Sequence, residues 1–424
     1  MATEGRVPRV AIRTLGCKVN RAESEAIAGE LLSRGACPVD GDATADVVVV
    51  NTCTVTSEAD AKARKEVRRA LARPGSPTVV VTGCLAALDP QGLGALGPRV
   101  IVQPDKTGVT ESVVRACGAT RVPARPIAIA PTARGLFRTR VTVKVQDGCD
   151  HRCAFCIVPD ARGLPRGVPM AGVVARVEAL VASGTREVVL AGINIGRYSD
   201  AGVDLAELVA GVAATGVARV RISSIEPLDL TPRLLARLEA TASVMPHLHV
   251  PLQSGSDAVL AAMRRGYDTA TFAKVLGEAR AAIPGLAVTT DVMAGFPGES
   301  DDDHRRTLAF VEQCGFSRLH VFRYSRRAGT PAAAMEGQVP PVRTAVRARE
   351  LRDLGTRLES GYAASRVGGT ADVLVESVDA GIVSGTSEDH LRVSAPVSDA
   401  RVGDVVRILL AESGVGGMRG VPSP

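Results

Sequence analysis

The sequence lacks long hydrophobic runs. No stretch approaches the roughly 18 consecutive apolar residues that a membrane-spanning helix needs. Near the start, Arg6 and Arg9 are not followed by the apolar segment of an export signal. From these absences we expect a cytoplasmic protein with no membrane partner.

Lysine is also scarce, since only six of the 51 basic residues are lysine. Such an arginine excess is more typical of codon usage in a GC-rich genome than of nucleic-acid binding. The net charge of +6 is therefore compatible with a polyanionic partner without requiring one. Apolar residues at 46% and charged residues at 23% exclude wholesale disorder. The length of 424 residues favours about two to four domains.

Nine cysteines form an odd number, which argues against a closed disulfide set. The densest group is Cys149, Cys153 and Cys156, directly after a strand-like stretch at 141–145. One loop can fold three sulfurs at this spacing around an inorganic cluster. Zinc is the alternative, with His151 as a fourth ligand, but no second Cys or His pair lies at finger spacing. On a four-iron cluster, three thiolates leave one iron open for chemistry.

Three more cysteines, Cys17, Cys53 and Cys84, each follow a short strand-like run and a polar or glycine turn. Helical patterns at 21–34 and 57–72 separate them, so the order predicts a parallel sheet. The carboxyl ends of parallel strands meet at one edge. We therefore predict a second cluster there, although single buried cysteines are ordinarily core residues. Cys37, Cys117 and Cys314 show no such pattern and are interpreted as core or surface residues.

The middle of the chain alternates between strand and helix patterns. Strands are predicted at 141–145, 186–191, 219–223, 247–251, 286–292 and 318–323, and helices at 170–183, 204–214, 231–241, 256–282 with a break at Gly266, and 301–314. Six such units fit a partial barrel, whose sites lie at the carboxyl ends of the strands. Turns at these ends predict a cofactor pocket, because glycine admits a close ligand and Ser, Asn and Gln can bond a ribose or an amino acid. Its candidate residues are Gly192, Asn194, Ser223, Ser224, Gln253 and Gly295.

Residues 368–424 change to short strand patterns separated by glycine turns, as in a small β-barrel. This region has four arginines against eight acids, a net charge of −4, whereas the rest of the chain carries +10. The segment 62–73 has six basic residues against one acid and either contacts phosphates or is a solvated helix face. A second arginine-rich stretch, 343–366, is interpreted as a linker helix.

The loop of three cysteines, with Phe155 before the last, resembles the signature of the radical S-adenosylmethionine (SAM) superfamily. Nearly the whole chain resembles the methylthiotransferases of that superfamily. The similar phrases lie at 14–20, 223–227, 249–256 and 295–299. The first two look most like the branch that modifies N6-threonylcarbamoyladenosine beside the tRNA anticodon.

This resemblance implies an α/β enzyme with three domains: an N-terminal parallel α/β cluster domain at 1–125, a central partial (β/α)6 radical SAM barrel at 135–366, and a C-terminal all-β TRAM-like barrel at 367–424. It implies two 4Fe–4S clusters. The one on Cys149, Cys153 and Cys156 would bind SAM and generate a 5'-deoxyadenosyl radical, and the auxiliary one on Cys17, Cys53 and Cys84 would carry the sulfur for adenine C2. The partners implied are tRNA, SAM, an electron donor and a sulfur source.

Two classes of alternative remain open from the sequence. One is a methylthiotransferase for isopentenyladenosine in tRNA or for a ribosomal protein aspartate, and the acidic C-terminal region would suit a basic ribosomal protein. The other is a non-enzymatic iron-sulfur protein that binds RNA or senses redox state.

Overall fold

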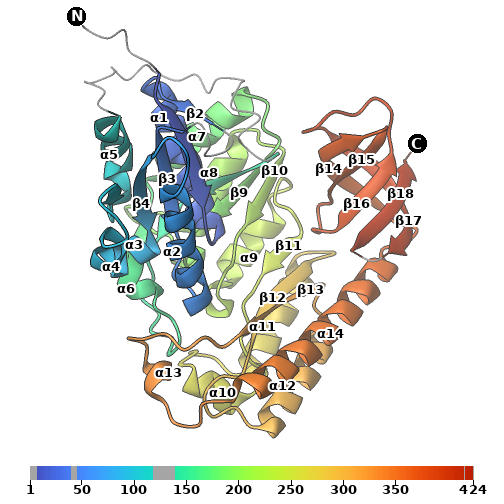
Figure 1. Ribbon diagram of the computed structural model, residues 1–424. Helices are drawn as coiled ribbons and strands as arrows, with labels where there is room; N and C mark the ends of the chain where they lie inside the picture. Colours follow the sequence, from blue (N-terminus) through green and yellow to red (C-terminus); the bar gives the residue numbers. More distant parts are fainter. Residues whose placement is uncertain (1–6, 40–44, 118–138, 415, 424) are drawn as a thin grey trace, which may run out of the picture.

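The computed structural model describes residues 7–39, 45–117, 139–414 and 416–423. It has an N-terminal α/β unit, a central array of parallel strands with outer helices, and a small C-terminal barrel beside the long helix α14 (Figure 1). The predicted fold class is confirmed. In the described part of the chain, no helix has the length and apolar character needed to cross a membrane.

The N-terminal unit is a five-stranded parallel sheet with the order β2-β1-β3-β4-β5. Its residues 47–50 and 79–81 are fully or almost fully buried, as expected where helices cover both faces of a parallel sheet. The predicted alternation of strands and helices is confirmed, and the edge strands β2 and β5 are additional. The bounds are β1 Arg9–Thr14, α1 Lys18–Ser33, β2 Cys37–Pro38, β3 Val47–Thr52, α2 Ser57–Leu71, β4 Thr78–Gly83, α3 Cys84–Leu88, α4 Pro90–Gly94, β5 Val100–Val102 and α5 Val109–Ala116.

The central unit holds six parallel strands in two groups, with the orders β10-β9-β6 and β11-β12-β13. A bridge between Val220 and Val244 joins the two groups. The strands are β6 Arg140–Lys144, β9 Glu187–Ala191, β10 Arg219–Ile222, β11 His247–His249, β12 Ala287–Ala294 and β13 Arg318–Arg323, with a small hairpin of β7 Gln146–Asp147 and β8 Arg166–Gly167. All six predicted strands are present.

The helices of the central unit are α6 Val158–Arg162, α7 Met170–Ala182, α8 Leu205–Ala214, α9 Pro232–Glu239, α10 Asp257–Ala262, α11 Thr269–Ala282, α12 Asp301–Cys314, α13 Pro331–Ala334 and α14 Pro341–Ser365. The predicted break at Gly266 separates α10 from α11. Capping boxes at Asp204 and Ser300 start α8 and α12. The boundary expected between residues 125 and 135 lies outside the described residues.

Side chains alternate along the barrel strands. Leu248, Val288 and Val292 belong to the core shared with the outer helices. Residues one position along the strands, among them His249 and Asp291, therefore face the inside of the partial barrel, which we call the lumen.

The C-terminal unit is a closed barrel with the order β14-β15-β16-β18-β17. Its bounds are β14 Thr370–Asp379, β15 Ile382–Thr386, β16 Arg392–Pro396, β17 Val405–Gly414 and β18 Gly417–Pro422. Arg221 of β10 reaches it by donating to the carbonyl oxygens of Ser387 (2.6 Å) and Glu388 (2.9 Å). The linker helix is confirmed as α14, and Arg347 within it pairs with Glu299 at 2.8 Å.

Candidate active site

The structure brings Cys17, Cys53 and Cys84 to one edge of the N-terminal sheet. Cys17 caps the start of α1, Cys53 follows β3, and Cys84 follows β4 directly. The strands that precede them are adjacent and parallel, so their carboxyl ends lie together. Burial raises the pKa of Cys53, and the charges of Cys84 and Cys17 raise it further, which places the three sulfurs within electrostatic range of one another.

Two turns at this edge leave no room for a larger residue. A Cβ on Gly16 would lie 2.8 Å from the Cys53 sulfur, and one on Gly83 would lie 2.3 Å from the carbonyl oxygen of Thr52. Both glycines have positive φ angles, which side chains rarely tolerate. Asn20 holds the same edge by donating to Leu15 O and Thr52 O, both at 2.8 Å.

The second set, Cys149, Cys153 and Cys156, lies in the loop between β7 and α6. Burial raises the pKa of Cys149 to about 11 and that of Cys156 to about 12. These thiols are therefore protonated at neutral pH, and a metal that binds them must release their protons. His151 approaches Cys149 through its backbone N–H, at 3.4 Å from the sulfur.

The spacing of the sulfurs bears on which metal would fit. Sulfurs around one tetrahedral zinc lie about 3.8 Å apart, given Zn–S bonds of about 2.3 Å. Among the described residues, only His249, Asp291 and His320 form a group whose ligand atoms all lie within 4.8 Å of one another. Neither cysteine set is so tight, although all nine cysteines are free. Each set is therefore wider than the ligand shell of a single zinc ion.

Arg162 connects the two cysteine sets. It ends α6, which follows the Cys149–Cys156 loop, and its Nε donates to the Cys84 sulfur of the other set at 3.1 Å. Its Nη1 donates to both Glu23 (2.9 Å) and Asp147 (2.8 Å). Burial alone would lower the pKa of Arg162, but the nearby anions raise it, so it stays charged.

Positive charge exceeds negative charge beside Cys84. Lys144 and Lys106 each approach Glu23 at 2.7 Å, so three cations with Arg162 surround the two carboxylates of Glu23 and Asp147. The excess cation compensates the charge of a thiolate. Burial raises the pKa of Cys84, and the charges of Arg162 and Lys106 offset only part of this cost of the deprotonation that metal binding requires.

Arg265 contacts a sulfur of the second cysteine set, as Arg162 does at the first. Its Nη1 donates to the Cys153 sulfur at 3.1 Å, and its other guanidinium nitrogens bind Glu226 and the hydroxyl of Tyr267. Glu226 lies in the turn after β10, so Arg265 ties this turn to the cysteine loop. Phe155 packs against Phe296 with an edge-to-face geometry.

The predicted cofactor residues follow the strands at the same edge. Gln146 organises them, since it accepts from Asn194 N (2.9 Å) and donates to Gly148 O (2.8 Å). Gly192 N donates to Ser223 Oγ at 3.3 Å, and Ser224 follows. Their positions agree with a shared pocket, while their binding of a cofactor stays a prediction.

Three of these positions carry specific signals. The side-chain oxygen and nitrogen of Asn194 are buried and have no hydrogen-bond partner of acceptable geometry among the residues that the structure describes, although Asp229 lies close. Gln253 has a positive φ of 71°, a strained conformation often kept at functional sites. Gly295 differs, because its N–H already donates to Glu299 at 2.6 Å. Of these three positions, Asn194 is the one whose buried side chain is best explained by a bound polar ligand.

Sequence reasoning missed Arg162, Arg265, Gln146 and Glu23. Gln146 lies next to the cysteine loop, and its place at a strand end could have marked it. The two arginines act on sulfurs 78 and 112 residues away, so no local pattern reveals them.

The two units also meet beside Cys53. Arg327 donates to Thr54 at 2.6 Å and pairs with Asp60, while Ser57 N donates to Ser325 Oγ at 3.0 Å. The segment 54–60 is therefore fixed against the segment 323–327, which follows β13. This contact holds the N-terminal cysteines toward the barrel.

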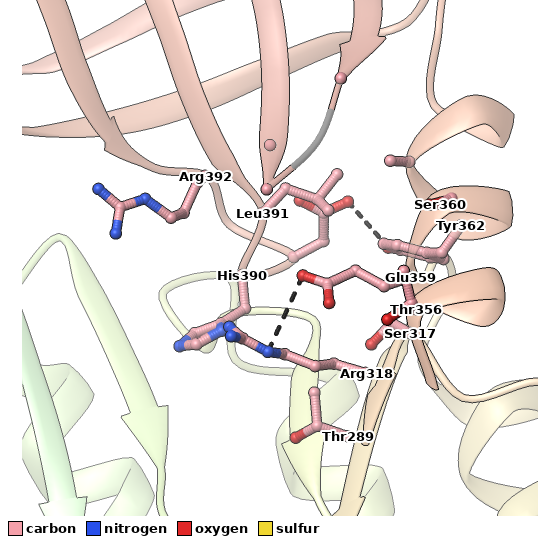
Figure 2. Close-up of a pocket in the computed structure, with 15 residues that line it drawn as sticks. Thr289, Ser317, Arg318, Thr356, Glu359, Ser360, Tyr362, His390, Leu391 and Arg392 are labelled. Atoms are coloured by element: carbon pink, nitrogen blue, oxygen red, sulfur yellow. Dashed lines mark hydrogen bonds and ion pairs between the residues drawn. The ribbon is translucent and has the colours of Figure 1, made fainter. Parts of the chain in front are cut away.

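A separate cavity of about 100 Å³ lies between the barrel, α14 and the C-terminal unit (Figure 2). Thr289, Arg318, Glu359, Tyr362 and His390 are among its lining residues, and Figure 2 shows Arg318 paired with Glu359. No cysteine lines it, so it is distinct from the cysteine sites.

The sequence matches two family models. Residues 143–311 match the one described as Radical SAM superfamily, and residues 9–102 match Uncharacterized protein family UPF0004. The threonylcarbamoyladenosine tRNA methylthiotransferase MtaB of Bacillus subtilis (strain 168) is 36% identical, over 96% of this chain and 94% of that protein. The tRNA-2-methylthio-N(6)-dimethylallyladenosine synthase of Acidothermus cellulolyticus (strain ATCC 43068 / DSM 8971 / 11B) is 35% identical, over 95% of this chain and 85% of that protein.

Solved structures share the fold. The radical S-adenosylmethionine methyltransferase TsrM from Kitasatospora setae matches with a TM-score of 0.55 and 14% identity, over 89% of this chain and 81% of that one. The cobalamin-dependent S-adenosylmethionine radical enzyme OxsB matches with a TM-score of 0.53 and 12% identity, over 82% of this chain and 55% of that one.

Proposed function

Because the chain belongs to the radical SAM methylthiotransferase family, we propose that it transfers a methylthio group to C2 of the adenine in N6-threonylcarbamoyladenosine of tRNA. The observation that carries the proposal is the pair of three-cysteine sets at the carboxyl edges of two sheets, joined by Arg162. An electron-transfer protein has no need of two sites that each lack a fourth cysteine.

Length favours the threonylcarbamoyl substrate. This chain covers 90% to 94% of three threonylcarbamoyladenosine methylthiotransferases but 84% to 86% of five dimethylallyladenosine synthases. The dimethylallyl substrate is the second candidate, because those relatives are 35% to 36% identical, as close as the others.

In this proposal, each set of three cysteines holds one 4Fe–4S cluster. When bound, the two clusters and SAM supply the radical that activates C2 and the methylthio sulfur that replaces its hydrogen. The chain itself fixes the ligands: Arg265 orients Cys153, Arg162 orients Cys84, and their charges compensate the thiolates.

The chain also supplies the proposed SAM pocket. Asn194 offers a buried amide that makes no hydrogen bond of acceptable geometry within the described chain, and Ser223, Ser224 and Gln253 offer polar atoms at neighbouring strand ends. The glycines at 192 and 295 shape the turns, since a Cβ at either would meet Gln146 or Thr344. Together these residues would orient SAM over the cysteine loop.

Anaerobic reconstitution tests the division of roles. Wild-type protein should bind about eight irons per chain, four in each cluster. Cys153→Ala should abolish cleavage of SAM to 5'-deoxyadenosine, whereas Cys53→Ala should retain cleavage and lose methylthio transfer. Cys37→Ala, at an exposed site, is the control and should change neither. Loss of both activities in folded Cys53→Ala would contradict the proposal.

The substrate is tested by mass spectrometry of tRNA nucleosides from cells that lack the gene. The 2-methylthio form of threonylcarbamoyladenosine should disappear and return on complementation. Its persistence, with loss of the dimethylallyl counterpart, would favour the second candidate. The cytoplasmic location, the electron donor and the sulfur source expected from the sequence belong to this proposal, and the last two have no assigned identity.

A further inference from the structure

Lys18 is a cation beside the N-terminal cysteine set that has no ion-pair partner among the described residues. It follows Cys17 directly and begins α1, whose first turn holds no acidic residue. A cation at a helix N-terminus is unfavourable, so helix stability does not explain it. Helix α1 packs along β6, the edge strand of the barrel.

The surroundings of Lys18 place it in the lumen. Its electrostatic neighbours are Arg140 of β6, Arg221 of β10 and Asp291 of β12, and these residues lie on the lumen face of their strands. Lys18 also acts on His247 and His390. Protein surrounds it on most sides, yet it remains accessible to solvent, as expected of a group that projects into an open cavity.

The charged residues near Lys18 already form ion pairs with other residues. Arg140 pairs with Glu376 at 2.9 Å, and Arg221 pairs with Glu187 at 2.7 Å. Asp291 lies 3.1 Å from His249 and 3.4 Å from His320. Within the described chain, Lys18 has no hydrogen bond or ion pair of its own. With Arg140 and Arg221 nearby, Lys18 makes this part of the lumen positive, so an arriving anion would be attracted to its ammonium.

The proposed substrate carries a suitable anion. In a threonylcarbamoyl group the amino nitrogen of threonine forms the carbamoyl link, so its carboxyl group is free and ionised at neutral pH. C2 and C6 of adenine flank N1, so C2 and the N6 substituent on C6 lie on the same edge of the base. Consecutive Cα atoms are about 3.8 Å apart. A nucleoside that directs C2 toward Cys17 therefore brings its N6 substituent within reach of residue 18.

We propose that Lys18 is a specificity-determining residue that binds the free carboxylate of the N6 substituent. This inference rests on the proposed function. A dimethylallyl group has no charge and would leave the ammonium without a partner, which disfavours that substrate.

The test compares reconstituted wild type, Lys18→Gln and Lys18→Arg, with Arg21→Gln as a matched control. Arg21 lies three residues along the same helix, so its replacement removes one positive charge from the same element. Each protein is given three anticodon stem-loops, whose adenosine carries threonylcarbamoyl, the same group with its carboxylate converted to a neutral amide, or dimethylallyl. Initial rates, stem-loop binding by fluorescence anisotropy, iron content and 5'-deoxyadenosine are measured.

Wild type should prefer the carboxylate to the amide by about 10- to 100-fold in kcat/KM, as for a charge-assisted contact. Lys18→Gln should lose that factor in both kcat/KM and stem-loop affinity on the carboxylate, and change less than about twofold on the amide. Lys18→Arg should keep most of the preference, and Arg21→Gln all of it. Iron content and 5'-deoxyadenosine should be the same in all four proteins.

If Lys18→Gln lost the same factor in kcat/KM on the carboxylate and amide stem-loops, or if it lost iron, Lys18 would act on the iron-sulfur cluster. Either result would overturn the inference. Turnover of the threonylcarbamoyl stem-loop by wild type without preference over the amide would overturn it while leaving the proposed function intact. Turnover of the dimethylallyl stem-loop alone would overturn the proposed function itself.

Discussion

The guanidinium of Arg162 donates to side chains from three separate segments. They are Asn20 and Glu23 on α1, Cys84 on α3, and Asp147 on β7. Its side chain is 2% exposed and that of Glu23 is 6% exposed. Removing one partner from such a buried network leaves uncompensated charge, which costs about 3–5 kcal/mol. This residue therefore contributes to stability as well as to the cysteine site.

Arg162→Met should destabilise the protein by about 3–5 kcal/mol at pH 7 in urea unfolding. Burial would raise the pKa of Glu23, but Arg162, Lys106 and Lys144 outweigh it and lower the pKa. A lowered folded pKa gives stability above the unfolded value of about 4.3, and this stability is lost as the pH falls through the folded pKa. The difference between wild type and variant should therefore shrink toward pH 3.

The matched control is Arg166→Met. Arg166 lies 3.9 Å from Asp147 with its side chain 65% exposed, so its loss should cost less than about 1 kcal/mol. An equal cost for the two variants, or a difference for Arg162→Met that does not vary with pH, would contradict the role of the buried network.

At the scale of elements, the sequence predicted most of the fold. The six barrel strands are marked by runs such as residues 186–191, and the break at Gly266 divides two helices as expected. The cysteine loop was predictable because its ligands lie within eight residues of one another. Strand β2 was missed because it has two residues, too few for a period. The contact between segments 54–60 and 323–327 was missed because nothing in either segment indicates the other.

Breaking the contact between segments 54–60 and 323–327 should reduce methylthio transfer without reducing SAM cleavage. Arg327→Ala should loosen the segment after Cys53, because Arg327 is almost buried and binds both Thr54 and Asp60. SAM cleavage should persist, whereas methylthio transfer should fall at least about tenfold, since small displacements of reacting groups are costly. Both products are quantified in the same anaerobic reaction.

Arg323→Ala is the control for this element. Arg323 pairs with Glu58 at 3.1 Å, but both side chains are more than half exposed, so little stability depends on the pair. Transfer should remain near the wild-type rate. If both variants reduce transfer alike, or if Arg327→Ala abolishes cleavage as well, the segment has a different role.

At the scale of the molecule, charge is divided between the units. The C-terminal barrel region carries a net charge of −4 and the rest of the chain +10. On α2, Ala63, Val67 and Ala70 are buried, and the opposite face exposes four basic residues, Lys62, Lys65, Arg68 and Arg69. Several arginines of α14 are instead committed to ion pairs. Helix α2 is therefore the stronger candidate for contact with tRNA phosphates.

Replacing the four exposed basic residues of α2 by Gln should weaken tRNA binding. It should also reduce the slope of log K against log salt by about one for each phosphate that is no longer neutralised. The control replaces four exposed arginines of the C-terminal barrel, Arg392, Arg401, Arg407 and Arg419. Affinity is measured by filter binding between 50 and 200 mM salt, a range of about fourfold. If tRNA affinity fell as much or more in the control, the C-terminal barrel would make the main electrostatic contact with tRNA.

The link between Arg162 and Cys84 also constrains biosynthesis. The chain emerges from the ribosome N-terminus first, and 78 residues separate this sulfur from its guanidinium. Cys17, Cys53 and Cys84 are therefore all translated before Arg162, which contacts the Cys84 sulfur. At the proposed cluster site, a nascent chain halted before residue 162 would lack the guanidinium that donates to the Cys84 sulfur.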